Sequence, residues 1–402
     1  MTLPAPSPFA RHWDLDPSIV FLNHGSFGAC PREVMAVQQQ LRAAMEAEPV
    51  RFVHREAEGR LDEARAALAQ FVGCNPDDLA FVPNATTGVN TVLRSLAFAP
   101  GDELLTTDHE YNACRNVLDF VAARHGAKVV TAAIPFPLQD PQQVVDAVLS
   151  RVTARTRLLL IDHVTSPTGL VLPIAPIVHA LRERGIDTLV DGAHAPGMVP
   201  LDLQALGAAY YTGNCHKWLC TPKGSALLHV RADRQAGVRP LAISHGANSQ
   251  RLDRSRFRLE FDFTGTDDPT PFLCVPAALR FLDGLLPGGI PALQAHNHQL
   301  ALRGRERLCR AIGSAPAAPP ALLGSLAAVL LPPSPAATVP PHGLDPLQVA
   351  LYERHHVEVP VMRWPVPALR VLRISPQIYN SDAQYEYLAA AVAARLADEP
   401  RG

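Results

Sequence analysis

Lysine is the rarest charged residue in this chain. It contains three lysines, Lys128, Lys217 and Lys223, against 33 arginines. Arginine stays charged in proteins, whereas a lysine amine can lose its proton and attack a carbonyl to form a Schiff base. Codon preference explains much of the arginine excess, but two of the lysines fall together in residues 216–224. This stretch is therefore a candidate for chemistry that needs an amine.

Other features are missing as well, and each absence excludes a class of protein. The net charge is −2 at pH 7 with no block of basic residues, which gives no indication of nucleic-acid binding. No apolar run reaches the roughly 18 to 20 residues that cross a membrane. The start, residues 1–8, lacks the basic residues and apolar stretch of a signal peptide. We expect a cytoplasmic protein that binds neither nucleic acid nor a membrane.

The cysteines and histidines form no known ligand pattern. The seven cysteines are odd in number, scattered and without a Cys-x-x-Cys pair, which favours reduced thiols. Sixteen histidines are present, but His-Glu-x-x-His does not occur, and we expect no metal site. No Gly-x-Gly-x-x-Gly follows a strand-like run, which disfavours a nicotinamide or flavin dinucleotide.

Length and patterning predict an α/β protein with two domains. A chain of 402 residues exceeds what one hydrophobic core normally supports. From about residue 79 to 230, short apolar runs alternate with helix-like segments, as in a mostly parallel sheet covered by helices on both faces. We predict a large domain over residues 15–270. A smaller α+β domain would cover residues 271–402, with residues 1–14 packing on it.

The expected second domain is less regular. After the alternation stops near residue 231, we predict a helix over 275–286 and a terminal helix from Asp382. Apolar runs at 325–331, 357–362 and 369–374 are typical of strands.

A carboxylate and a lysine follow neighbouring predicted strands. Asp191 ends an apolar run and opens Asp-Gly-Ala-His194, and Lys217 follows the next strand-like segment. Ligands of open α/β sheets bind at the carboxyl ends of strands. Pyridoxal phosphate requires a lysine for an imine and an anion that keeps its ring nitrogen protonated. A turn at Asp-Gly and a surface position for Lys217 are the ordinary alternatives for each residue alone, but together they favour a cofactor site.

Residues 84–88, Asn-Ala-Thr-Thr-Gly, lie where a predicted strand gives way to a helix. Free N–H groups and the hydroxyls of Thr86 and Thr87 would form an anion site there, aided by the helix dipole. An ordinary helix N-cap is the alternative. Asn214 and His216 would add donors beside the lysine, so this segment is a candidate phosphate site.

Six motifs follow one another along the chain: Asn84-Ala-Thr-Thr-Gly, Asp108-His-Glu-Tyr-Asn-Ala, His163-Val-Thr-Ser-Pro-Thr-Gly, Asp191-Gly-Ala-His, His216-Lys217 and Arg373-Ile-Ser. In this order they resemble the class V aminotransferase family of fold-type I pyridoxal-phosphate enzymes. The segments 21–28 and 216–224 are most similar to its isopenicillin N epimerase-like branch. The resemblance covers about residues 13 to 390 and implies the fold-type I transferase fold, the cofactor pyridoxal 5′-phosphate and a homodimer with shared active sites.

The same resemblance implies roles for individual residues. Lys217 would form the internal aldimine, and Asp191 would pair with the pyridinium nitrogen. Tyr111 would stack on the ring, with His109 as the alternative. The remaining contacts would be Ser166 and His194 with the ring's 3-oxygen, Thr86, Thr87, Asn214, His216 and the partner's Thr266 with the phosphate, Arg373 with the substrate α-carboxylate, and His24 with the substrate side chain.

The sequence leaves the reaction open. We interpret the chain as an enzyme that acts at Cα of an amino acid or its derivative, with Lys217 as the base and Asp191 holding the ring that stabilises a quinonoid. The resemblance favours an epimerase-like reaction. The alternatives are a C–S (β-elimination) lyase or cysteine desulfurase-like enzyme, and an aminotransferase.

Two further observations bear on these alternatives. Desulfurases of this family carry a nucleophilic cysteine after a paired histidine, but here Val357 follows His355 and His356. Persulfide chemistry at that position is therefore not expected. A non-catalytic binding module on the same fold is the alternative from another class, and the retained pair of Lys217 and Asp191 disfavours it.

Overall fold

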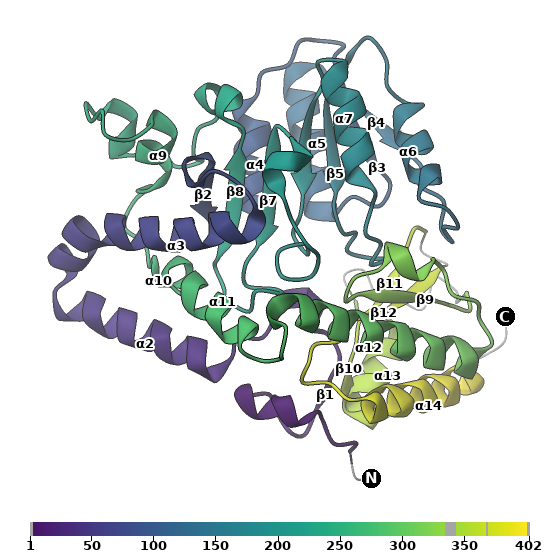
Figure 1. Ribbon diagram of the computed structural model, residues 1–402. Coiled ribbons are helices and arrows are strands. Elements are labelled where there is room, and N and C mark those ends of the chain that lie inside the picture. Colours follow the sequence, from purple (N-terminus) through teal and green to yellow (C-terminus); the bar gives the residue numbers. More distant parts are fainter. Residues whose placement is uncertain (1–2, 334–342, 367–368, 400–402) are drawn as a thin grey trace.

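The protein is described by a computed structural model that covers residues 3–333, 343–366 and 369–399 (Figure 1). Its centre is a seven-stranded sheet of order β2-β8-β7-β6-β5-β3-β4. Strands β3 to β7 pair in parallel, whereas β8 is antiparallel to both β7 and β2. The strands are β2 (Leu79–Val82), β3 (Glu103–Thr107), β4 (Lys128–Ala132), β5 (Thr156–Asp162), β6 (Asp187–Asp191), β7 (Tyr210–Asn214) and β8 (Ala226–Val230).

Helices cover both faces of this sheet. In β5, Leu158 and Leu160 pack into one hydrophobic cluster, whereas Leu159 and Ile161 pack into another. Because alternate residues of a strand point to opposite faces, the two clusters are the two sides of the sheet. One side is covered by α4 (Ala85–Ser95) and α5 (Asn112–His125), the other by α6 (Gln142–Leu149) and α7 (Ile174–Glu183). The predicted α/β architecture is confirmed.

A group of helices extends to one side of the sheet (Figure 1). The short α1 (His24–Phe27) leads to α2 (Arg32–Ala47), and a π-helical turn at Arg51–Glu56 joins α2 to α3 (Ala57–Val72). The helices α10 (Thr270–Leu273) and α11 (Val275–Asp283) pack against α2 and α3. Two further short helices are α8 (Leu203–Leu206), which contacts α7, and α9 (Arg256–Phe261).

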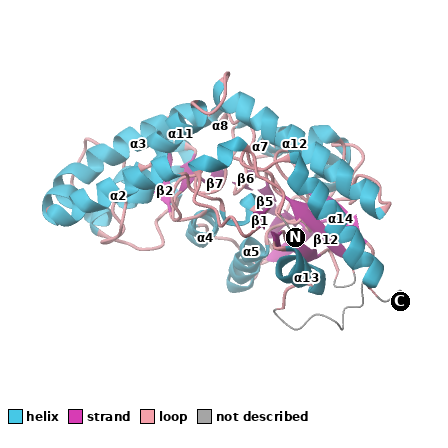
Figure 2. Ribbon diagram, turned by 90° about the horizontal axis from the view of Figure 1, so that it is seen from below, coloured by secondary structure: helices cyan, strands magenta, loops and turns pink. Residues whose placement is uncertain are grey.

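The C-terminal part pairs a small antiparallel sheet with long helices (Figure 2). Its sheet has the order β11-β12-β9. The helices α12 and α14 pack along each other, and α13 packs on α14. The elements are α12 (Gly289–Ile312), β9 (Ala327–Leu331), α13 (Pro346–His355), β11 (Val361–Arg363), β12 (Arg370–Ile374) and α14 (Asp382–Asp398).

The single strand predicted over 357–362 is wrong, because two short strands of different sheets lie there. β10 (Val357–Glu358) pairs in parallel with β1 (Val20–Phe21), whereas β11 pairs with β12. Pro360 stands between them, and proline has no N–H to continue a ladder. Among the described residues, no helix is long and apolar enough to cross a membrane.

The N-terminal segment joins the C-terminal part over more residues than predicted. Besides the β1–β10 pairing, the N–H of Leu22 donates to the carbonyl of Glu358, and the N–H of Ser375 donates to that of Leu22. One hydrophobic cluster also continues from the central sheet into α12 and β9. The division of the chain into domains of residues 15–270 and 271–402 stays a prediction. Residues 20–22, which that division assigns to the large domain, form backbone hydrogen bonds with the C-terminal part.

Candidate active site

A cavity of about 520 Å³ opens at the carboxyl ends of β5, β6 and β7. This is the end of a parallel sheet at which α/β proteins bind ligands. Eight residues predicted for the site line it: Thr86, Tyr111, Ser166, Asp191, His194, Asn214, His216 and Lys217.

Lys217 lies in the loop that follows β7, with its amine buried in the cavity wall. Burial, and then the nearby Arg373 cation, lower the pKa of the amine to about 8. Its Nζ atom is 3.1 Å from Nε2 of His194, while the indole N–H of Trp218 donates to Nδ1 of His194 at 3.4 Å. Because that N–H can only donate, Nδ1 of His194 accepts, and the proton of the neutral imidazole lies on Nε2, where it can be donated to the Lys217 amine once that amine has lost its own proton. Lys217 is thus prepared to act as a nucleophile or base.

The backbone of Lys217 is held from behind by the N-terminal segment. His24 is buried, donates from Nε2 to the carbonyl of Lys217 at 2.9 Å, and receives the hydroxyl of Tyr379 on Nδ1 at 2.8 Å. Gly28 has φ +70°, and a Cβ atom there would lie 2.0 Å from the carbonyl oxygen of His216. The loop that carries the lysine therefore packs directly on the residues around α1.

Asp191 ends β6 and is almost fully buried. Its Oδ1 accepts the N–H of Ala193 at 2.9 Å, and its Oδ2 accepts the thiol of Cys114 at 3.1 Å. Burial raises the pKa of Asp191, although these two donors and the charge of Lys217 act in the opposite direction. A cation placed against Asp191 would favour its ionised form.

The first turn of α4 closes another side of the cavity. The side chain of Asn84 caps the helix by accepting the N–H of Thr87 at 2.8 Å, and Asn214 accepts the N–H of Ala85 at 2.8 Å. Within the described residues, no hydrogen bond uses the N–H of Thr86, and Thr86 lines the cavity. A helix start with a free N–H favours an anion.

His216 stands beside this helix start in its neutral form. It donates from Nδ1 to the carbonyl of Ser225 at 2.9 Å, and burial lowers its pKa to about 4. With Nδ1 carrying the proton, Nε2 accepts. An anion bound next to it would favour a second proton there.

Arg373 is a buried cation close to Lys217, and it has no carboxylate partner among the described residues. Its Nη1 donates to the carbonyl of Ser166 at 2.5 Å, and its Nη2 donates to Oγ of Ser26 at 3.2 Å. Its Nε is buried and finds no hydrogen-bond acceptor among the residues that the structure describes. Burial lowers the pKa of Arg373 to about 10. A guanidinium held in this way can bind a carboxylate through two hydrogen bonds.

Three residues predicted for the site lie elsewhere within this chain. His24 lies behind Lys217 and uses both ring nitrogens there, so it does not line the cavity. The hydroxyl of Thr87 donates to Asn84 and belongs to the helix cap. Thr266 is exposed in the loop after α9. Of the two stacking candidates, Tyr111 lines the cavity with 45% exposure, whereas His109 packs on Trp364 with ring centroids 4.4 Å apart.

The sequence interpretation missed several residues that line the same cavity. Asp162 ends β5 beside Asp191, with Oδ2 buried and without a hydrogen-bond partner in the described part of the chain. Its place at the end of an apolar run was a usable signal. Ser26 and Phe27 enter from α1 and Lys223 from the lysine loop, and nothing local in the sequence indicates their direction.

Comparison with known proteins adds to this geometry. Residues 20–388 match the pattern of the family described as aminotransferase class-V. An isopenicillin N epimerase of Amycolatopsis lactamdurans is 38% identical over 392 residues, which cover 94% of this chain and 95% of that protein. A probable chloroplastic L-cysteine desulfhydrase of Arabidopsis thaliana is 30% identical, with 96% of this chain and 84% of that protein covered.

Solved structures show the same fold at lower identity. A C-DES variant with glycine covalently linked to its pyridoxal-phosphate cofactor superimposes with a TM-score of 0.79 at 20% identity, over 96% of this chain and 99% of that one. A cysteine desulfurase from Escherichia coli gives 0.78 at 21% identity, over 97% and 98%.

Proposed function

The chain belongs to the aminotransferase class V family of pyridoxal-phosphate-dependent enzymes, and we propose that its reaction is inversion at Cα of an amino acid or amino-acid derivative. The isopenicillin N epimerases, at 36 to 38% identity over most of the chain, support this choice. The observation that carries the proposal is a lysine of lowered pKa in the cavity wall, close to a buried arginine that bonds the cavity residues Ser166 and Ser26 and lacks a carboxylate partner among the described residues.

The residues of the cavity fit pyridoxal 5′-phosphate. Asp191 is a buried carboxylate that would hold the ring nitrogen, and Lys217 is the amine that would join the aldehyde carbon. Ser166 and His194 would bind the ring's 3-oxygen, and Thr86, Asn214 and His216 the phosphate. The unused N–H of Thr86 supports the phosphate assignment. When bound, the cofactor withdraws electrons from Cα and so makes its proton acidic.

The reaction needs a base and an acid on opposite faces of Cα. We assign removal of the proton to Nζ of Lys217, because a pKa of about 8 leaves an appreciable neutral fraction near neutral pH. Arg373 would fix the substrate carboxylate and so the direction of the Cα–H bond. We place the ring of Tyr111 against the cofactor, and its phenol is our candidate for the second proton donor.

Elimination of a β-substituent is the second candidate function. Its support is the identity of 30% to the probable L-cysteine desulfhydrase and the presence of the same base and carboxylate anchor. No cysteine is among the described residues that line the cavity, so no lining thiol could accept sulfur to form a protein-bound persulfide. Release of sulfide without such an acceptor remains compatible with the site, as does transamination.

One experiment separates these reactions. The enzyme is incubated with L- and D-amino acids, peptide-like amino acids and thioether conjugates in deuterated water. Deuterium at Cα with loss of optical purity and no loss of amine supports inversion. Formation of pyruvate and ammonia would instead indicate elimination. Formation of a 2-oxo acid together with the amine form of the cofactor would indicate transamination. No visible cofactor band and no turnover would point to a binding module.

We also propose a homodimer that completes the site. A second cavity of about 630 Å³ lies between α3 and residues 245–272, and Thr264 and Gly265 on its rim precede the exposed Thr266. Large apolar side chains are exposed near it or on the flanking segments: Val50, Ile243, Leu252 and Phe263. A second copy would cover this surface, and the partner's Thr266 would reach the phosphate.

A complementation experiment tests this arrangement. Lys217→Ala and Thr266→Ala proteins are mixed, dissociated and allowed to reassociate. If Thr266 acts across the interface, one site of each mixed dimer has both residues, and tight cofactor binding returns in the mixture. Recovery no greater than the sum of the separate proteins would contradict it.

The cytoplasmic location is likewise a proposal. It is supported by the cysteines, which are all free thiols and mostly buried. Unpaired thiols are typical of reducing compartments. Cell fractionation with an antibody against the protein checks it.

A further inference from the structure

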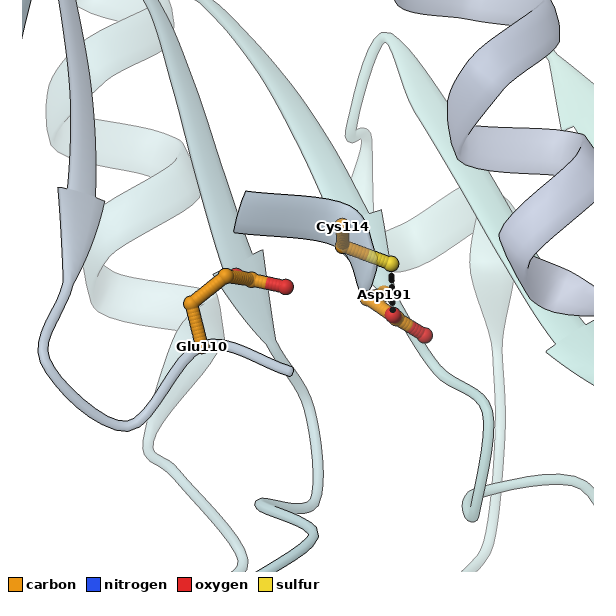
Figure 3. Close-up of side chains that lie close together, drawn as sticks. All are labelled: Glu110, Cys114 and Asp191. Atoms are coloured by element: carbon orange, nitrogen blue, oxygen red, sulfur yellow. Dashed lines mark hydrogen bonds between the residues drawn. The ribbon is translucent and has the colours of Figure 1, made fainter. Parts of the chain in front are cut away.

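A thiol and a second carboxyl group lie beside Asp191 (Figure 3). Cys114, in the first turn of α5, donates its thiol to Oδ2 of Asp191 at 3.1 Å. A carboxyl oxygen of Glu110, the sulfur of Cys114 and an oxygen of Asp191 all lie within 4.8 Å of one another. Glu110 extends toward the other two from the segment before α5. None of the roles assigned above uses it.

The surroundings of Glu110 offer its charge little compensation. Both of its carboxyl oxygens are buried and have no hydrogen-bond partner in the described part of the chain. Asp191 on β6 and Asp162 on β5 add two more carboxyl groups, and Thr106 on β3 is the neutral neighbour. The cation from α5, Arg115, already donates to Asp119 and Thr131.

Hydrogen bonds distinguish Asp191 from Glu110. Asp191 accepts an N–H and an S–H and faces Lys217, and all three favour its ionised form. No hydrogen bond of normal geometry reaches Glu110 within the described residues, and the nearby N–H of Tyr111, hydroxyl of Thr106 and charge of Arg115 lower its pKa less than burial and Asp191 raise it. Buried carboxyl groups this close cannot all ionise, and the proton stays on the one with the fewest donors. Burial and the neighbouring Asp191 accordingly raise the pKa of Glu110 well above its ordinary value.

We propose that Glu110 is a positioning residue that stays a neutral acid and holds the surplus proton of this cluster, so that Asp191 keeps the negative charge that faces the cofactor's ring nitrogen. The second half of this statement rests on the proposed function, because it needs pyridoxal phosphate next to Asp191. The first half concerns the protein alone. Cys114 acts with Glu110, since its buried thiol keeps its proton and donates it to Asp191.

The first test uses the protein without cofactor. In its infrared spectrum near neutral pH, we expect a C=O stretching band of a protonated carboxyl group that is lost in Glu110→Gln. The control is Glu63→Gln, which changes an exposed glutamate on α3 and should keep the band. A wild-type spectrum without any such band overturns the proposal even if no variant folds. If Glu110→Gln removes no part of this absorption, the proposal is overturned too; a remainder can come from Asp162, because burial and Glu110 raise the pKa of that carboxyl as well.

The second test uses the visible absorption of the bound cofactor. Because glutamine replaces a neutral acid with a neutral amide, the pH midpoint of this band should move by less than about 0.3 unit in Glu110→Gln. If Glu110 were an anion, its removal would destabilise nearby positive charge and lower the midpoint by about one unit or more. Such a shift overturns the proposal. So does a stoichiometric divalent cation that is lost in Glu110→Gln, because the same three side chains would then be ligands.

The two tests separate the possible failures. If added pyridoxal phosphate never gives a visible band, the proposed function fails, while the infrared measurement still decides the state of Glu110. If the band forms but the infrared signal is absent, the inference about Glu110 fails and the proposed function stands.

Discussion

Nε2 of His24 donates a hydrogen bond to the carbonyl oxygen of Lys217 at 2.9 Å, across 193 residues of sequence. This contact, completed by Tyr379 on the other ring nitrogen, ties α1 to the loop that presents the amine. His24 is deeply buried, and burial lowers its pKa to about 3, so it stays neutral in this role. The histidine thus supports the lysine from its backbone side.

Replacing His24 with alanine should loosen the lysine loop. It leaves a buried carbonyl and a buried hydroxyl without partners and opens a cavity, which together cost about 2 to 4 kcal/mol of unfolding free energy. Denaturant unfolding measures this, and cofactor binding should weaken in parallel. The exposed His179→Ala should change stability by less than about 0.5 kcal/mol. Equal effects of the two changes would contradict the role of His24.

The lowered pKa of Lys217 predicts a pH dependence of cofactor addition. The rate of pyridoxal phosphate addition to the cofactor-free enzyme should rise with pH, with a midpoint near the pKa of about 8. Arg373 lowers this pKa, so Arg373→Gln should move the midpoint to higher pH. Stopped-flow absorbance follows both proteins. A midpoint at the ordinary value of 10.5, or a shift to lower pH, would be inconsistent with this electrostatic account.

The same pKa affects stability. Between the folded pKa of about 8 and the ordinary value of 10.5, the unfolded chain binds more protons at this lysine than the folded chain does. The contribution of Lys217 to the unfolding free energy therefore increases with pH through this window and is lost as pH falls through it. Comparing wild type with Lys217→Met across the window isolates this term. A flat difference would contradict the lowered pKa.

Arg373 should govern the recognition of the substrate carboxylate. Arg373→Lys keeps the charge but loses the planar pair of donors, and KM for amino acids should rise about tenfold to a hundredfold. Amines without a carboxylate should be handled as before. The exposed Arg124→Lys serves as the control. If KM for both substrate classes rises equally, Arg373 acts on the fold and not on the carboxylate.

His216 should take up a proton when an anion binds beside it. Its pKa of about 4 in the free protein leaves it neutral, and a phosphate dianion next to Nε2 would raise that pKa. Binding of inorganic phosphate to the cofactor-free enzyme in weak buffer should therefore consume protons. In His216→Gln this uptake should fall, and phosphate affinity should drop by about tenfold. Unchanged uptake in the variant would place the phosphate elsewhere.

The sequence predicted the sheet well, because buried parallel strands leave short apolar runs that are hard to mistake. Asp191 and Lys217 follow two of these runs, and they could be predicted to lie close together because parallel strands end at the same edge of the sheet. Helices with clear caps, such as α5 with Gly126 as its C-cap and α14 with Ser381 as its N-cap, were also predictable.

Other features depend on packing that no local pattern encodes. The long helix α12 was missed because it starts between two glycines without a side-chain cap. Pro360 divides a run that otherwise has the pattern of one strand. The approach of Glu110 and Cys114 to Asp191 is set by how α5 docks on the sheet, and the direction of His24 is set by Tyr379 on a segment far along the chain.

The most direct test of the whole account is to identify which lysine the cofactor binds. The enzyme is loaded with pyridoxal phosphate and reduced with sodium borohydride, and its peptides are mapped by mass spectrometry. The account predicts a single pyridoxyl label on Lys217, strongly reduced in Asp191→Ala. A label on Lys128 or Lys223 instead, or no label at all, would contradict it.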